Sequence, residues 1–120
     1  MRNVVTGAGG WIACAGILAA EALDRHLAHA GVLDPSSLVH IARNCTKWRF
    51  SESWETAAIE RRFPLICLVF RNGSEGVMIE IPTYGGRPEP IRIHADGGAG
   101  IPSCQAVVRE FYRTLVTLGT

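Results

Sequence analysis

Apolar residues recur at helical spacing towards both ends of the chain. Between residues 11 and 30 the apolar stripe consists of Ile12, Ala15, Ala19, Leu23 and Leu27. Steps of three to four residues predict a helix over this segment. A second such stripe, within residues 103–118, consists of Cys104, Val107, Val108, Phe111, Leu115 and Leu118. It predicts a second amphipathic helix. Between them, Asp34 followed by Pro35 predicts a turn or short helix that continues to Arg43.

The middle of the chain carries the patterns of strands. Four strands are predicted, at residues 46–51, 65–70, 77–81 and 91–94. The first alternates, with Trp48 and Phe50 on one face, and the next two are dense apolar runs. Asn72-Gly73 between these two runs is a strong hairpin signal. The pattern of residues 52–62 favours neither a helix nor a strand.

The order helix, strands, helix predicts an α+β domain. We expect an antiparallel four-stranded meander with helices packed on one face, because each element must bury its apolar side. The length of 120 residues suits a single domain, residues 1–120. Trp11 and the alanine-rich face of the first helix are expected to pack on the sheet or to meet a partner.

Composition and charge narrow the class of function. The chain has 12 basic and 11 acidic residues, a net charge of +1, which gives no electrostatic argument for nucleic acid. The apolar run at residues 11–20 is shorter than the ~20 residues that span a bilayer. We therefore expect a cytoplasmic protein with no membrane partner.

Cofactor and metal motifs are incomplete. Thr6-Gly7-Ala8-Gly9-Gly10 looks like the opening of a short-chain dehydrogenase, but no strand–helix alternation follows it. The histidines at 26 and 29 have no further ligand at useful spacing, and the cysteines at 14, 45, 67 and 104 form no Cys-x-x-Cys pair. We expect no cofactor, no metal and reduced thiols.

Cys104 is the candidate nucleophile. It falls in the first turn of the last predicted helix, after a glycine-rich approach, and the positive end of the helix dipole lowers the pKa of a thiol there. His94, at the end of the preceding strand, is a candidate base or orienting group. Cys104 also lies on the apolar stripe of its helix, which favours a buried, structural cysteine instead.

Residues 76–104 resemble the centre of a ubiquitin-conjugating enzyme. A strand, a proline-rich crossover at residues 82–90, a second strand and then a lone cysteine follow in that order. Tyr84 matches the crossover tyrosine of the family, and Pro88 the first proline of its Pro-Pro pair. The resemblance implies that Cys104 carries a ubiquitin-like protein as a thioester. It also implies that an activating enzyme docks on the first helix.

The same segment departs from the family pattern and leaves alternatives open. Gly85 and Glu89 stand where the family has prolines, and no His-Pro-Asn precedes the cysteine. One alternative is a non-catalytic binding or adaptor module of the same fold, in which Tyr84, Pro88 and Trp11 contribute to binding. Another is a small bacterial chaperone or immunity-type protein that dimerises through its sheet.

Overall fold

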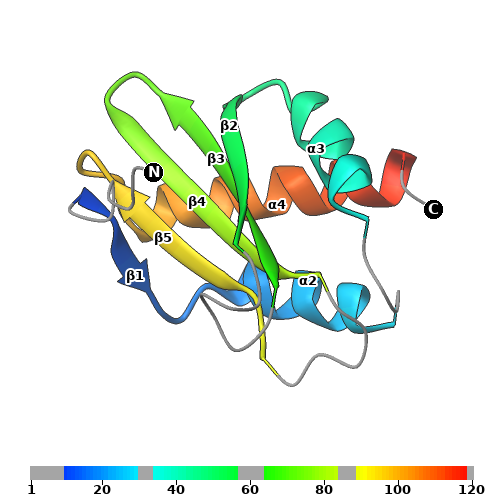
Figure 1. The fold of residues 1–120 in the computed structure, drawn as a ribbon. Helices are drawn as coiled ribbons and strands as arrows, with labels where there is room; N and C mark the ends of the chain where they lie inside the picture. Colours follow the sequence, from blue (N-terminus) through cyan, green and yellow to red (C-terminus); the bar gives the residue numbers. More distant parts are fainter. Residues whose placement is uncertain (1–9, 30–33, 57–63, 84–88, 119–120) are drawn as a thin grey trace.

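The computed structural model describes residues 10–29, 34–56, 64–83 and 89–118 as an α+β fold (Figure 1). Its elements are β1 (Ile12–Cys14), α2 (Leu18–Ala28), α3 (Pro35–Arg43), β2 (Arg49–Thr56), β3 (Leu65–Asn72), β4 (Glu75–Pro82), β5 (Arg92–Asp96) and α4 (Ile101–Leu118). The α+β class and the antiparallel meander are as the sequence predicts.

The sheet has five strands, in the order β1-β5-β4-β3-β2, and every neighbouring pair is antiparallel. Strands β2 to β5 form the predicted meander. The expected count of four is wrong because β1 adds to the outer edge of β5, where Ile12 lies opposite Ala95 and Cys14 opposite Ile93. Such pairing joins segments far apart in the sequence, so no local pattern reveals it.

The predicted helix over residues 11–30 is therefore shorter than expected. Helix α2 begins at Leu18, and the residues before it belong to β1. Gly16 separates the two elements with a φ of 75°, a left-handed conformation that interrupts a helix and suits glycine. Trp11 precedes β1 and does not lie on α2, which corrects its expected place on the first helix.

Strand β2 begins later than predicted and runs further, over Arg49–Thr56 in place of residues 46–51. The carboxylate of Glu110, on α4, accepts hydrogen bonds from the backbone N–H groups of Thr46, Lys47 and Trp48. These three N–H groups donate to Glu110 and not to a neighbouring strand, so β2 starts only after them. An irregularity in the pairing with β3 between Phe50 and Glu52 then shifts the register.

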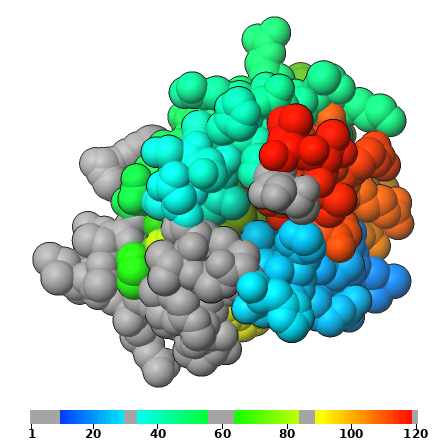
Figure 2. Space-filling model, turned by 90° about the vertical axis from the view of Figure 1, so that its right-hand side faces the viewer, coloured from blue at the N-terminus to red at the C-terminus, as the bar shows by residue number. Residues whose placement is uncertain are grey.

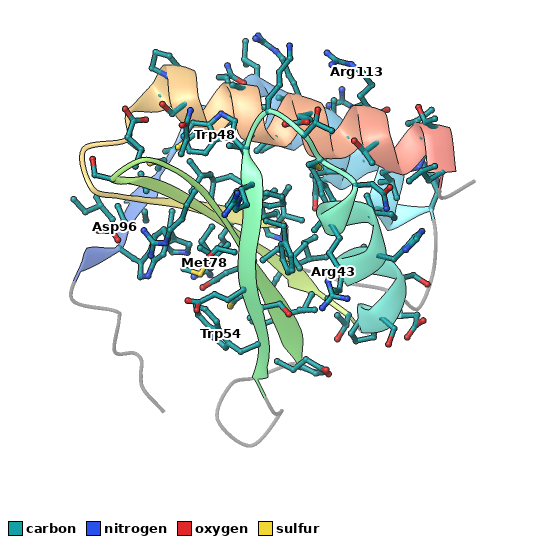
Figure 3. The ribbon with its side chains drawn as sticks, turned by 90° about the horizontal axis from the view of Figure 1, so that it is seen from above. Arg43, Trp48, Trp54, Met78, Asp96 and Arg113 are labelled. Atoms are coloured by element: carbon teal, nitrogen blue, oxygen red, sulfur yellow. The ribbon has the colours of Figure 1, made fainter. Side chains whose placement is uncertain are left out.

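The three helices of the described residues pack on one face of the sheet, as expected (Figure 3). The core between the two layers includes Leu23 from α2, Phe70 from β3 and Phe111 from α4, and these side chains have essentially no exposed surface. The rings of Phe70 and Phe111 meet edge to face, with centroids 6.2 Å apart. Figure 2 shows the end of α4, in red, beside α3 in cyan and α2 in blue.

The opposite face of the sheet has its own apolar cluster. Leu65, Cys67 and Val69 of β3 and Met78 of β4 are buried there, and Trp11 packs against them. Figure 3 shows Met78 and Trp54 on this side and Trp48 on the side of α4. The alternation of side chains along each strand separates the two clusters.

Candidate functional site

Cys104 lies in the first turn of α4, where its backbone N–H donates to the carbonyl of Gly100 at 3.1 Å. Its side chain is 0% exposed and belongs to the core between helices and sheet. Transfer of an acyl group to a thiol needs a thiolate and room for the donor. A buried thiol in this position lacks that room.

The thiol of Cys104 contacts that of Cys14 on β1, with their sulfur atoms 3.7 Å apart. Burial, together with the neighbouring Cys14, raises the pKa of Cys104 to about 12. The position in the helix suggests the opposite direction, because a helix N-terminus stabilises a thiolate. Loss of hydration outweighs the helix dipole here, so Cys104 is a protonated thiol near neutral pH.

His94 is not brought to Cys104. On β5, Ile93 and Ala95 face the helices, so His94 between them faces the opposite side of the sheet. Its Nε2 atom lies 3.3 Å from Oε2 of Glu80, which meets the distance of an ion pair. The same atom forms no hydrogen bond of good geometry, so the contact is one of proximity and not a well-aligned bond. Cys104 and His94, the predicted nucleophile and base, therefore lie on opposite sides of the sheet.

Trp11 was expected to pack on the sheet or to meet a partner. It packs on the sheet, on the face that the helices do not cover. The guanidinium carbon of Arg71 lies 5.5 Å from the centre of its ring, and Arg71 also pairs with Asp96 at 3.6 Å. Gly76 makes this approach possible, because a Cβ there would lie 2.8 Å from Arg71 and 3.2 Å from Trp11. Trp11 therefore packs within the domain, against Arg71 and Gly76.

The remaining predicted binding residues, Tyr84 and Pro88, lie outside the described residues. On either side of them the crossover is tied to the domain. The N–H of Thr83 donates to the carbonyl of Pro64 at 3.2 Å. Glu89 forms an ion pair with Arg92 at 3.6 Å.

The free edge of β2 is the open surface that sequence patterns did not reveal. Among the described residues this strand pairs only with β3, so no other described strand pairs with the backbone groups of its outer edge. Side chains of residues 51–55 are all exposed, and since they alternate between faces, neither face of the strand is covered there. The sequence gives only part of the signal: this stretch is polar apart from Trp54, which indicates exposure but does not indicate that the strand lies at an edge.

A polar depression of about 400 Å³ lies where α3 ends and β2 begins. It is lined by Arg43, Cys45, Thr46, Arg49, Phe50 and Ser51. The carboxylate of Glu110 accepts a hydrogen bond from the backbone N–H of Thr46, one of the lining residues, and Cys45 contacts the hydroxyl of Thr114 at 3.7 Å. The depression therefore belongs to a fixed part of the fold.

Two cations of this depression have no anionic partner within the described part of the chain. Among the described residues, neither Arg43 nor Arg49 forms an ion pair, whereas Arg71 and Arg92 do. Figure 3 shows Arg43 beside β2, at the side of α3. Further along β2, Glu52 and Glu55 are exposed, so the edge is basic at its start and acidic towards its end. We define the β2 edge site as Arg43, Arg49 and the outer edge of residues 49–56.

Other candidate chemistry has little support in the described part of the chain. There, no three His, Cys, Asp or Glu side chains lie close enough together to hold a metal ion. The ring of His26 meets that of Tyr112 edge to face, with centroids 5.5 Å apart. No helix within the described ranges is long and apolar enough to cross a membrane.

Comparisons of the chain with models of protein families, with curated proteins and with solved structures found no match. The geometry and charges of the β2 edge site are therefore the basis for assigning a role.

Proposed function

We propose that this domain is a non-catalytic protein-binding module that accepts an extended peptide segment as an added strand along the β2 edge site. The observation that carries the proposal is the outer edge of β2, with which no strand in the described ranges pairs, and whose residues 51–55 are exposed on both faces. An open strand edge presents a row of donors and acceptors that an extended segment satisfies. Main-chain hydrogen bonds would supply affinity and the side chains selectivity.

The charges of the site specify the segment. Arg43 and Arg49 favour an acidic side chain or a terminal carboxylate at the start of β2, since guanidinium groups bind carboxylates through paired hydrogen bonds. Glu55 lies six residues after Arg49, a span of ~20 Å at the rise of a strand. The bound segment should therefore be acidic at one end and basic at the other.

The buried thiol supports a binding role over a thioester role. Cys104 is enclosed, and its pKa is raised to about 12 by burial and by Cys14. His94 lies across the sheet from it. In this proposal the domain shares the meander and following helix of the ubiquitin-conjugating fold, but neither an activating enzyme nor a ubiquitin-like protein reacts with it.

The test uses the full chain labelled with ¹⁵N and a designed seven-residue peptide. The peptide alternates valine and threonine, with aspartate at one end and lysine at the other, and is tested in both chain directions. We expect saturable changes in amide chemical shift along β2. A peptide of the same sequence, N-methylated at alternate residues, should not bind, because methylation removes the donors that pair with the edge.

Charge reversal tests the selectivity of the site. Arg43→Glu and Arg49→Glu should each weaken binding at least several-fold, because they place a carboxylate beside the acidic end of the peptide. Arg113→Glu on α4 makes the same change of charge at an exposed position away from β2 and should bind as the wild type (Figure 3). Equal binding of the methylated peptide, or shift changes confined to another surface, would contradict the proposal.

A further inference from the structure

Cys14 and Cys104 form a cysteine pair that the proposed function does not use. Cys14 lies on β1 and Cys104 on α4, and their sulfur atoms are 3.7 Å apart, in van der Waals contact. The other two cysteines have different surroundings. Cys45 contacts Thr114 and the carbonyl of Ile41, and Cys67 lies on the opposite face of the sheet.

We propose that Cys14 and Cys104 are a dithiol site that closes to an intramolecular disulfide on reaction with a small-molecule disulfide such as oxidised glutathione. None of the four cysteines, all of which are described residues, forms a disulfide in this structure. The cross-link would join the first strand of the sheet to the last helix. The inference is independent of peptide binding at β2.

The geometry requires only a small adjustment. A disulfide has its sulfur atoms ~2.05 Å apart, so the present contact must shorten by ~1.7 Å. Cys104 lies in the core, whereas Cys14 lies on a three-residue strand that pairs on one side only among the described residues. Rotation of the Cys14 side chain with a small shift of β1 is the route that leaves the core in place.

The reaction proceeds in two exchange steps that balance. Cys14 is only partly buried, so its thiolate attacks one sulfur of oxidised glutathione, forms a mixed disulfide and releases one glutathione thiolate. The Cys104 thiolate then attacks the Cys14 sulfur and expels the second glutathione thiolate. The protein loses two electrons and two protons, and one oxidised glutathione becomes two reduced glutathiones.

The direction of attack follows from exposure. Cys104 has no surface for a first encounter with the oxidant, but it lies next to the Cys14 sulfur at which the second step occurs. Burial is the largest cause of the raised pKa of Cys104 and still acts after Cys14 has formed the mixed disulfide, so the second step is slow near neutral pH. The appropriate measurement is therefore an equilibrium and not an initial rate.

The test equilibrates the full chain in glutathione buffers of increasing oxidised fraction, followed by quenching with acid and trapping of free thiols with N-ethylmaleimide. We expect intact mass to show a species that has lost two hydrogens and keeps two reactive thiols. A peptide map without reductant should contain Cys14 linked to Cys104. Hydrogen exchange in β1 and β5 should slow in the oxidised form, because the cross-link holds the edge strand.

Two variants make the result decisive. Cys14→Ser, at a partly exposed position, should fold and fail to form the cross-link, whereas Cys67→Ala should still form it. A mixed disulfide on Cys14 that persists at the most oxidising ratio would overturn the proposal. So would a peptide map that links another pair, or a cross-link that forms in Cys14→Ser.

Discussion

The carboxylate of Glu110 accepts a hydrogen bond from the backbone N–H of Lys47 at 2.9 Å, which attaches the start of β2 to α4. The N–H of Trp48 donates to the same carboxylate at 3.2 Å. Burial alone would raise the pKa of Glu110, but these backbone donors and the N–H of Thr46 outweigh it and lower the pKa. The charged form of Glu110 is therefore the one that the fold requires.

Replacement of Glu110 by glutamine should lower the free energy of unfolding by about 1–3 kcal/mol at pH 7, since a neutral oxygen replaces a charged acceptor. The pKa of Glu110 is lower in the folded than in the unfolded protein, where a glutamate titrates near about 4.3. Its contribution is therefore complete above that value and is lost as the pH falls through the folded pKa.

Urea unfolding of wild type and Glu110→Gln at several pH values measures this contribution. The difference in stability should be largest near pH 7 and should shrink in acid. Glu21→Gln, an exposed glutamate on α2, is the matched control and should change stability little. A difference that stays constant from pH 7 to strong acid would show that the charge of Glu110 is not involved.

Two leucines of α2 should respond differently to the same substitution. Leu23 is 0% exposed, and Leu23→Asp should cost on the order of 4 kcal/mol, because it buries an unpaired charge. Leu18 is 67% exposed at the start of the helix, and Leu18→Asp should change stability by less than about 0.5 kcal/mol. Thermal unfolding followed by circular dichroism measures both. Equal losses in the two variants would refute the assigned orientation of α2.

Gly76→Ala should disturb the contact between Arg71 and Trp11. It would place a Cβ 2.8 Å from a guanidinium nitrogen of Arg71 and 3.2 Å from Trp11, and should cost about 1 kcal/mol, because the flexible end of Arg71 can move aside while the ring of Trp11 must shift slightly. Gly100→Ala is the control, since its nearest contact, at 3.6 Å to Pro102, is an ordinary one. Chemical unfolding of both variants should separate them. If Gly76→Ala is as stable as the wild type, the packing of Trp11 on Arg71 is looser than described.

Alkylation should distinguish Cys14 from Cys104 and decide between the binding and thioester roles. In the folded protein, iodoacetamide should modify the partly buried Cys14 and leave Cys104 unmodified until the chain unfolds. Mass spectrometry of peptides after timed labelling, with and without urea, measures this order. Rapid labelling of Cys104 in the folded protein would reopen the thioester hypothesis.

The sequence was informative where structure is local. The apolar runs that became β3 and β4, the Asn72-Gly73 turn between them and the amphipathic pattern of α4 all depend on neighbouring residues. Strand β1 depends on pairing with β5, and its three residues carry no alternation long enough to oppose a helical reading. At this point the pairing of β1 with β5 outweighs the local helix propensity.

The relation of Cys104 to His94 was predictable in principle. Residues 93 and 95 are apolar while 94 and 96 are polar, and that alternation indicates that His94 faces away from a helix-covered core. The contact between Cys14 and Cys104 was not predictable, because it depends on how β1 and α4 meet in space. The β2 edge site also needed the structure, since strand order decides which strand is an edge.

The pairing of β1 with β5 also has a consequence for folding kinetics. Ile12 lies opposite Ala95, and α2 packs along α4, so the first two described elements pack against the last two. A nascent chain can form the hairpin of β3 and β4 early, but it cannot close the β1 side of the sheet until β5 has emerged. Contacts of such high sequence separation slow folding. Removal of either β1 or α4 should therefore affect the whole domain rather than one end of it.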